Sequence, residues 1–265
     1  MAERSPEQRY GEFVAVRSHA YVAELALDRP KAMNAVSSEM ARSLAAACEA
    51  LAADRDVRVV VVTSTHERAF CVGADLKERN SLTDAELVRQ RPVARAAYTG
   101  VLDLPMPTIA AVHGYALGLG YSLAQSCDLI VAAEGTKFQI REVQRGLGGA
   151  QHWVATWFWT GSRFANEVAL TGRMFDAGEA LQHGMVNRVV PEAKRIATAE
   201  ALAAEIVENP PLAVRANVRV MRWFVNEMQR QSRLYTQGRG LHLTDDFRES
   251  AEAFVAKRKP IFKGK

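Results

Sequence analysis

Residues 107–122 read PTIAAVHGYALGLGYS, a short apolar run that breaks into glycines at positions 114, 118 and 120. The apolar run predicts a buried strand, and the apolar segment Leu123–Cys127 predicts a helix. Glycines let a ligand approach the main chain, and the first N–H groups of a helix lack acceptors. Strand, glycine turn and helix start together indicate either an oxyanion site or, equally, a place where a helix packs closely on a strand.

A second stretch repeats this arrangement. Val59–Thr63 is a β-branched run that predicts a buried strand, and the glycine-containing segment Phe70–Lys77 follows it. Two such turns in one chain could direct two separate N–H groups at one carbonyl oxygen. The sequence therefore favours an oxyanion hole built from main-chain groups.

The composition excludes several classes of protein. The 265 residues are 48% hydrophobic and 24% charged, which suffices for one large core, or for a core with a smaller lobe. The net charge of +4 is mild and the longest basic run is Lys257–Lys259, so we expect no nucleic-acid partner. No apolar run approaches the roughly 18 residues of a membrane span, so we expect no membrane partner. Three scattered cysteines and a polar start favour the cytoplasm and no metal site.

Local patterns predict further elements. Alternating residues predict a hairpin, Ser37 or Ser38 is expected to begin a helix, and Thr83 and Glu86 form a capping-box pattern. Past Pro191 the pattern is helical. The expected elements are strands at Phe13–Arg17, Tyr21–Leu27 and Met185–Val190, and helices from Ser37 to about Ala53 and from Thr83 towards Asp103.

A set of ordered motifs gives a resemblance to a known family. The motifs are Leu27–Ala35, Phe70–Lys77, Ala110–Gly120, Leu170–Gly172, Gly184–Val186 and Phe254–Pro260. Together they resemble the enoyl-CoA hydratase/isomerase (crotonase) superfamily from about Phe13 to Phe262. The resemblance implies an α/β fold, with a crotonase-like spiral of ββα units over residues 1–192 and a C-terminal helical trimerisation region over residues 193–265.

The resemblance also implies the substrate and its contacts. The substrate is expected to be an acyl-CoA thioester, so coenzyme A enters as part of the substrate and no other cofactor is expected. The chain is expected to form a homo-oligomer, either a trimer or a dimer of trimers. By position, the N–H groups of Ala74 and Leu119 form the oxyanion hole, and the CoA contacts are Lys31, Ala32, Asp75, Leu76, Lys77, and, from a neighbouring subunit, Phe254 and Lys257.

Two positions decide the chemistry that the resemblance implies. The family's two-glutamate hydratases carry one catalytic carboxylate where this chain has Ser122, while the second is kept as Glu142. Adding water to a double bond requires both activation of water and protonation of Cα, which paired carboxylates share. A lone glutamate suffices for moving a proton between carbons α and γ. We therefore expect Glu142 to transfer protons, Ser122 to orient water, and the adjacent Arg141 to keep Glu142 ionised.

Other interpretations stay open. A serine with a glutamate at these places also resembles the hydroxycinnamoyl-CoA hydratase-lyases. Gly120–Ala124 resembles a loosened nucleophile elbow, which would suit a serine hydrolase with His183 or His242 as base. A non-catalytic family member is the third alternative. His152 stands alone beside a tryptophan, and we expect a structural role for it.

Overall fold

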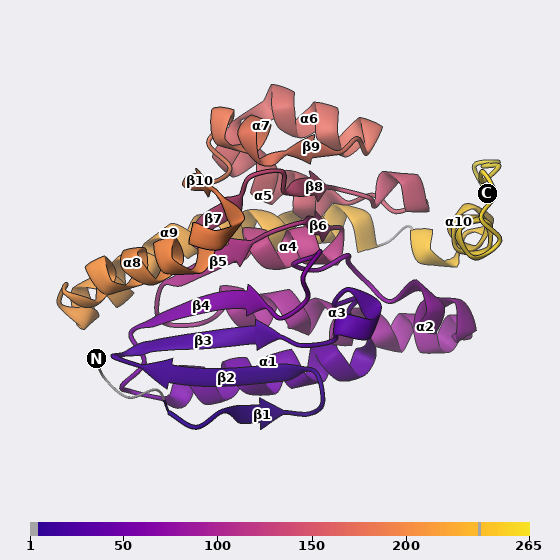
Figure 1. The fold of residues 1–265 in the computed structure, drawn as a ribbon. Helices are drawn as coiled ribbons and strands as arrows, with labels where there is room; N and C mark the ends of the chain where they lie inside the picture. Colours follow the sequence, from indigo (N-terminus) through magenta and orange to yellow (C-terminus); the bar gives the residue numbers. More distant parts are fainter. Residues whose placement is uncertain (1–4, 238–239) are drawn as a thin grey trace.

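The computed structural model describes residues 5–237 and 240–265, and a seven-stranded sheet forms its centre (Figure 1). The first three strands pair antiparallel, and all later neighbours pair parallel. Parallel neighbours need crossover connections, which helices supply here. In spatial order the strands are β1 (Gln8–Tyr10), β2 (Val14–His19), β3 (Val22–Leu27), β4 (Val59–Ser64), β5 (Thr108–Val112), β7 (Leu129–Ala133) and β10 (Arg188–Val190).

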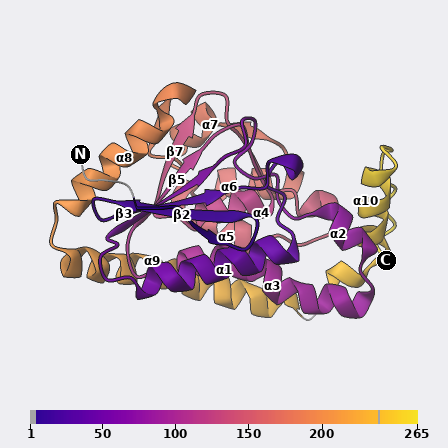
Figure 2. The same ribbon diagram turned by 60° about the horizontal axis from the view of Figure 1, so that its bottom comes forward.

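Helices cover both faces of this sheet, as Figure 2 shows. Side chains alternate along a strand, so Val60 and Val62 of β4 join the larger apolar core together with α1 (Ser38–Ala53) and α3 (Asp84–Leu102). Val59 and Val61 face the opposite side and pack with α8 (Arg195–Val207). Burial on both faces explains why β4 is a continuous apolar run.

A smaller sheet positions the glycine-rich turn. It consists of β6 (Tyr115–Leu117), β8 (Lys137–Gln139) and β9 (Phe175–Asp176), and α4 (Leu119–Gln125) begins directly after β6. The start of α4 lies against the segment after β4, because a Cβ on Gly120 would lie 2.1 Å from the carbonyl oxygen of Cys71. Only glycine permits that approach.

The remaining elements are mostly helical, and beyond Pro191 the described chain is helical as expected. No helix in the part of the chain that is described has the length and apolar character needed to cross a membrane. The elements are α2 (Leu76–Ser81), α5 (Ala150–Thr160), α6 (Ser162–Thr171), α7 (Ala177–Gln182), α9 (Pro211–Gln237), α10 (Asp245–Val255) and the 3-10 helices η1 (Pro30–Ala32), η2 (Val143–Arg145), η3 (Glu192–Lys194) and η4 (Leu241–Leu243).

Two expected helix starts are confirmed. The Ser37 hydroxyl accepts a hydrogen bond from the N–H of Met40 at the start of α1. Thr83 and Glu86 form the expected capping box at the start of α3. Both caps depend on residues close in the sequence, which is why the pattern predicted them.

Strand boundaries were wrong at the hairpin and at the last strand. The hairpin turn lies at Ala20 and Tyr21, which adopt φ of 46° and 70°, so β2 extends to His19 instead of ending at Arg17, and β3 begins at Val22 instead of Tyr21. The last strand is only Arg188–Val190, not the six residues from Met185. The N–H of Met185 donates to Ala180 in α7 and closes the end of that helix after Gly184, so the strand begins later.

Candidate active site

A cavity of about 720 Å³ lies where the two glycine-containing turns meet. Ala74 lines it from the turn after β4, and Leu119 lines it from the first position of α4. The two turns are in close contact, because a Cβ on Gly73 would lie 3.4 Å from the nitrogen of Leu119. The structure thus brings together the two segments that the sequence singled out.

The N–H groups of Ala74 and Leu119 do not take part in the backbone hydrogen bonds of the bridge and the helix to which these residues belong. On either side of Ala74, the N–H of Val36 donates to Gly73 and the N–H of Asp75 donates to Val36. In this parallel bridge the N–H of Ala74 points away from Val36. Leu119 is the first residue of α4, so its N–H has no acceptor within that helix.

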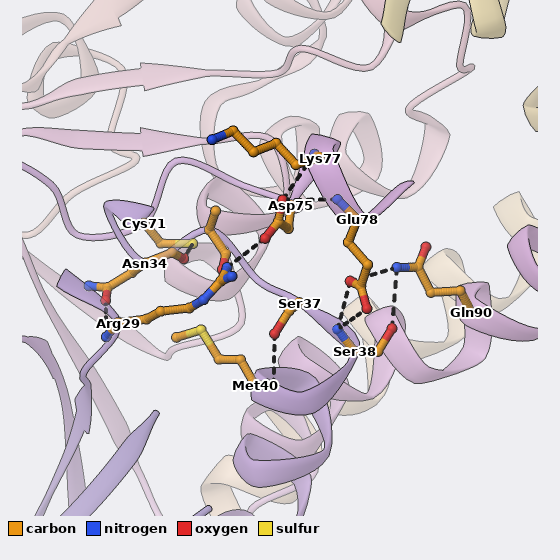
Figure 3. Close-up of polar contacts among 11 residues, drawn as sticks. Arg29, Asn34, Ser37, Ser38, Met40, Cys71, Asp75, Lys77, Glu78 and Gln90 are labelled. Carbon is orange, nitrogen blue, oxygen red and sulfur yellow. Dashed lines mark hydrogen bonds and ion pairs between the residues drawn. The ribbon is translucent and has the colours of Figure 1, made fainter. Parts of the chain in front are cut away.

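Asp75 fixes the turn that carries Ala74 (Figure 3). Its carboxylate accepts a hydrogen bond from Arg29 at 2.7 Å and caps α2 by accepting from the N–H groups of Lys77 and Glu78. Burial raises the pKa of Asp75, but the Arg29 guanidinium and the helix N–H groups lower it more, so the net direction is down. The Asp75 carboxylate is therefore occupied by protein partners, which leaves its main chain for any contact with CoA.

Glu78 extends the same polar network to α1 and α3, as Figure 3 also shows. Its carboxylate accepts from the N–H of Ser38 at 2.9 Å and from the Gln90 amide at 3.1 Å. The first turn of α2 is consequently joined to the helices on both sides. This network holds Ala74 through the neighbouring backbone.

Glu142 lines the cavity, and the side chain of His152 contacts its carboxylate. His152 Nε2 lies 3.0 Å from the Glu142 carboxylate, and the two side chains are 7% and 15% exposed. His152 Nδ1 in turn makes a short hydrogen bond with the Ser122 hydroxyl. Glu142 and His152 line the large cavity, whereas Ser122 lines only a small separate one beside His152. The three side chains form a line from the cavity into the core.

The protons in this line follow from the chemistry of the groups. An ionised carboxylate only accepts hydrogen bonds, so His152 Nε2 carries the proton that Glu142 accepts. In the neutral imidazole, Nδ1 is then an acceptor for the Ser122 O–H. Both nitrogens of the His152 ring thus have a hydrogen-bond partner, and the ring orients the Glu142 carboxylate.

Glu142 is held in its ionised form. Burial raises its pKa, but the electrostatic attraction and hydrogen bond of the His152 N–H together with the charge of Arg79 lower it more, and the net direction is down. We expected the adjacent Arg141 to keep Glu142 ionised, and the larger contributions come from His152 and Arg79. A carboxylate in this state can accept a proton at neutral pH.

Comparison with known proteins identifies the family. Residues 17–265 match the family model described as enoyl-CoA hydratase/isomerase. The chain belongs to this family. It is accordingly an enzyme of the enoyl-CoA hydratase/isomerase type, and the resemblance found in the sequence is confirmed.

Individual members of the enoyl-CoA hydratase/isomerase family match over nearly the whole chain. A carnitinyl-CoA dehydratase of Salmonella typhi is 34% identical over 92% of this chain and 95% of its own length. A crystal structure of carnitinyl-CoA hydratase from Mycobacterium avium has a TM-score of 0.82 at 32% identity, covering 97% of this chain and 100% of that one. An enoyl-CoA hydratase/isomerase structure from Mycobacterium paratuberculosis has a TM-score of 0.83 at 30% identity, covering 90% and 97%. The expected α/β crotonase-like fold is thereby confirmed.

The residues expected to contact CoA differ in how exposed they are. Leu76 lines the cavity, and its neighbour Lys77 is exposed. Ala32 is half-buried, and its neighbour Lys31 is exposed. Phe254 of α10 is exposed and stacks under the guanidinium of Arg145, whose central carbon lies 4.8 Å from the ring centroid. Lys257 lies just past α10 with φ of 52°.

His152 was not predicted as a site residue. Its expected structural role does not describe its position, because it contacts the glutamate from which we expected the chemistry. Only the fold brings the two segments together, since a Cβ on Gly149, the residue before α5, would lie 3.0 Å from Glu142 Cβ. Of the two histidines considered as hydrolase bases, His183 stacks on Phe164 and His242 lines the large cavity.

Proposed function

We propose that this enzyme binds an enoyl-CoA thioester, polarises its carbonyl oxygen with the N–H groups of Ala74 and Leu119, and transfers protons with Glu142. The observation that carries the proposal is that all three residues line one cavity, with the Glu142 carboxylate held ionised. Main-chain donors aimed at a developing oxyanion stabilise an enolate at little cost in reorganisation.

One carboxylate can serve the reaction in sequence. In hydration, Glu142 takes a proton from water as the hydroxyl adds to Cβ, and the negative charge moves to the thioester oxygen. Glu142 then returns the proton to Cα. In isomerisation it removes a proton from one carbon of the enoyl group and returns it to another through the same enolate.

Ser122 acts through His152 in this proposal. Its hydroxyl lies behind the imidazole and lines only the small cavity, so we assign it a positioning role instead of contact with water at the substrate. The same arrangement disfavours the serine hydrolase alternative. The line Ser122–His152–Glu142 has the residue types of a hydrolase triad, but Ser122 is the fourth residue of α4, most of a helical turn from β6, and does not line the cavity that Ala74 and Leu119 line.

We also propose a homo-oligomer and a cytoplasmic location. Large apolar side chains of α9 such as Trp223, Phe224 and Val220 are exposed in the single chain, and such surfaces commonly mark contacts between subunits. The three cysteines are buried free thiols, which suits a reducing compartment.

The Glu142→Gln variant tests the proposal. Glutamine keeps the shape and an acceptor for His152 but cannot take up a proton, so kcat on an enoyl-CoA should fall by about 100-fold or more. The dissociation constant of CoA should change by less than about threefold, because CoA contacts lie elsewhere. Product masses distinguish hydration, which adds one water, from isomerisation. Turnover that survives in this variant would disprove the assignment of Glu142.

A further inference from the structure

The wall of the active-site cavity is strongly basic. Six arginines line it: Arg79 from α2, Arg91 and Arg95 from α3, Arg141 and Arg145 from the Glu142 segment, and Arg248 from α10. The lining contains only two carboxylates, Glu142 and Glu252, and Glu142 is already paired with His152. Apolar side chains such as Leu82, Leu87 and Phe247 share this wall and suit a hydrocarbon segment, but they offer no partner to the arginines.

Most of these arginines lack an acidic partner. Arg248 pairs with Asp84, and Arg145 donates to the Ser250 carbonyl at 3.0 Å. Within residues 5–237 and 240–265, no carboxylate lies within ion-pair distance of the other four, Arg79, Arg91, Arg95 and Arg141. The buried Nε of Arg141 has no hydrogen-bond partner at all in the described structure.

The electrostatics of the cluster favour binding of an anion. Burial lowers the pKa of Arg79, Arg91 and Arg141, and the charge of Arg95 lowers that of Arg91 further. Burial and the charge of Arg141 lower the pKa of Arg145 to about 10. Guanidiniums that are desolvated and close to one another are stabilised by a bound anion.

The position of the cluster indicates which part of a substrate would carry that anion. With the thioester carbonyl at Ala74 and Leu119, the acyl group occupies the cavity that the arginines line, whereas the phosphates of CoA lie at the far end of the pantetheine arm. The lysines expected to contact CoA, Lys31 and Lys77, do not line this cavity. Arg91 and Arg95, one helical turn apart on α3, present two guanidiniums to one ligand.

We propose that the acyl group of the substrate ends in a carboxylate, which the unpaired arginines of the cavity bind. The substrate class is then the CoA monothioesters of dicarboxylic acids, and the inference rests on the proposed function only in placing the thioester at Ala74 and Leu119. A neutral acyl chain would leave the guanidiniums without the hydrogen bonds they lose on desolvation. The same arginines therefore disfavour the binding of neutral acyl chains.

Binding of saturated thioesters tests this inference separately from catalysis, because these compounds cannot be hydrated or isomerised at a double bond. Calorimetry would compare glutaryl-CoA with pentanoyl-CoA, and adipyl-CoA with hexanoyl-CoA, at matched chain length. The carboxylated member of a pair should bind at least about tenfold more tightly. Equal or tighter binding of the neutral member in both pairs would overturn the inference, and the Glu142→Gln result would be unaffected.

Variants identify the groups that contact the carboxylate. Arg95→Gln and Arg141→Gln should each weaken binding of the preferred carboxylated thioester by roughly 10- to 100-fold while changing the neutral partner by less than about threefold. Arg89→Gln is the matched control, since Arg89 is exposed on α3 and does not line the cavity. If Arg95→Gln and Arg141→Gln instead weaken free CoA by the same factor as the thioester, the arginines bind phosphate and the inference is wrong. Melting temperatures of the variants, expected at or above that of the parent protein, exclude misfolding as the cause.

Discussion

Replacing Arg222 with methionine should destabilise the protein by about 3–5 kcal/mol, the usual cost of breaking a buried ion pair by removing one partner. Arg222 lies in α9, and its side chain and that of Asp128 are 7% and 8% exposed. The guanidinium donates to both Asp128 carboxylate oxygens and to the carbonyl groups of Leu102, Leu104 and Met106. It thereby fastens the C-terminal helical region to the end of α3 and the start of β5.

The size of the effect follows from what the substitution leaves behind. Methionine fills much of the space but provides no donors, so three backbone carbonyls and one carboxylate lose a charged partner. Asp128 keeps its bonds from the N–H and hydroxyl of Thr108, at 2.7 and 3.1 Å, which places the expected loss towards the lower end of the range. For a chain of this size that corresponds to a fall in melting temperature of about 6–20 °C.

Thermal unfolding monitored by circular dichroism would measure the fall in melting temperature. All variants are compared at one protein concentration, because the melting temperature of an oligomer depends on concentration. Arg89→Met is the matched control, since Arg89 is an exposed arginine on α3, away from the α9 surface proposed for subunit contact, and should shift stability by less than about 0.5 kcal/mol. If Arg222→Met melted within about 2 °C of the parent protein, Arg222 would not be the anchor that its contacts indicate.

Three further predictions concern the turn, the proton-transfer group and the assembly. Gly120→Ala should lower the free energy of unfolding by at least about 3 kcal/mol, measured by urea denaturation, because the new Cβ would lie 2.1 Å from the Cys71 carbonyl oxygen. A loss under about 1 kcal/mol would show that the turn can relax. His152→Asn removes the group that most lowers the pKa of Glu142, so burial should raise that pKa and move the acid limb of kcat/KM to higher pH; an unmoved limb in a pH–rate series contradicts this. Trp223→Glu, at a position 59% exposed on α9, should dissociate the homo-oligomer in sedimentation velocity, and a parent protein that already sediments as a monomer would refute the proposed contact.

The parts of the fold that the sequence predicted are those with local causes. A continuous apolar run identified β4, alternation identified the first hairpin, and the caps at Ser37 and Thr83 identified the starts of α1 and α3, because each pattern involves residues a few positions apart. The wrong boundaries come from main-chain conformations that the alternation of side chains does not report. Met185 closes the end of α7 through a bond to Ala180, and Ala20 and Tyr21 form the hairpin turn with positive φ.

In the candidate site, too, the residues within sequence motifs were predicted, and those that depend on packing were not. Glu142, Ala74 and Leu119 were found through motifs, whereas the link from Glu142 through His152 to Ser122 depends on how α5 packs against α4. The basic cavity wall was missed because Arg79, Arg95 and Arg141 come from separate elements, and nothing in their spacing predicts that they share a cavity. Only the packed structure shows which charges remain without partners.

The line of side chains behind Glu142 restricts how this enzyme could gain a second catalytic acid. A Ser122→Glu exchange alone would force a carboxylate into the space that the His152 ring occupies, with no opening to the cavity. Positions 122 and 152 must therefore change as a pair, the serine enlarging only as the imidazole is replaced by something smaller. An engineer who wishes to turn a one-acid site into a two-acid site in this scaffold would begin with His152→Gly or His152→Ala, and only then alter position 122.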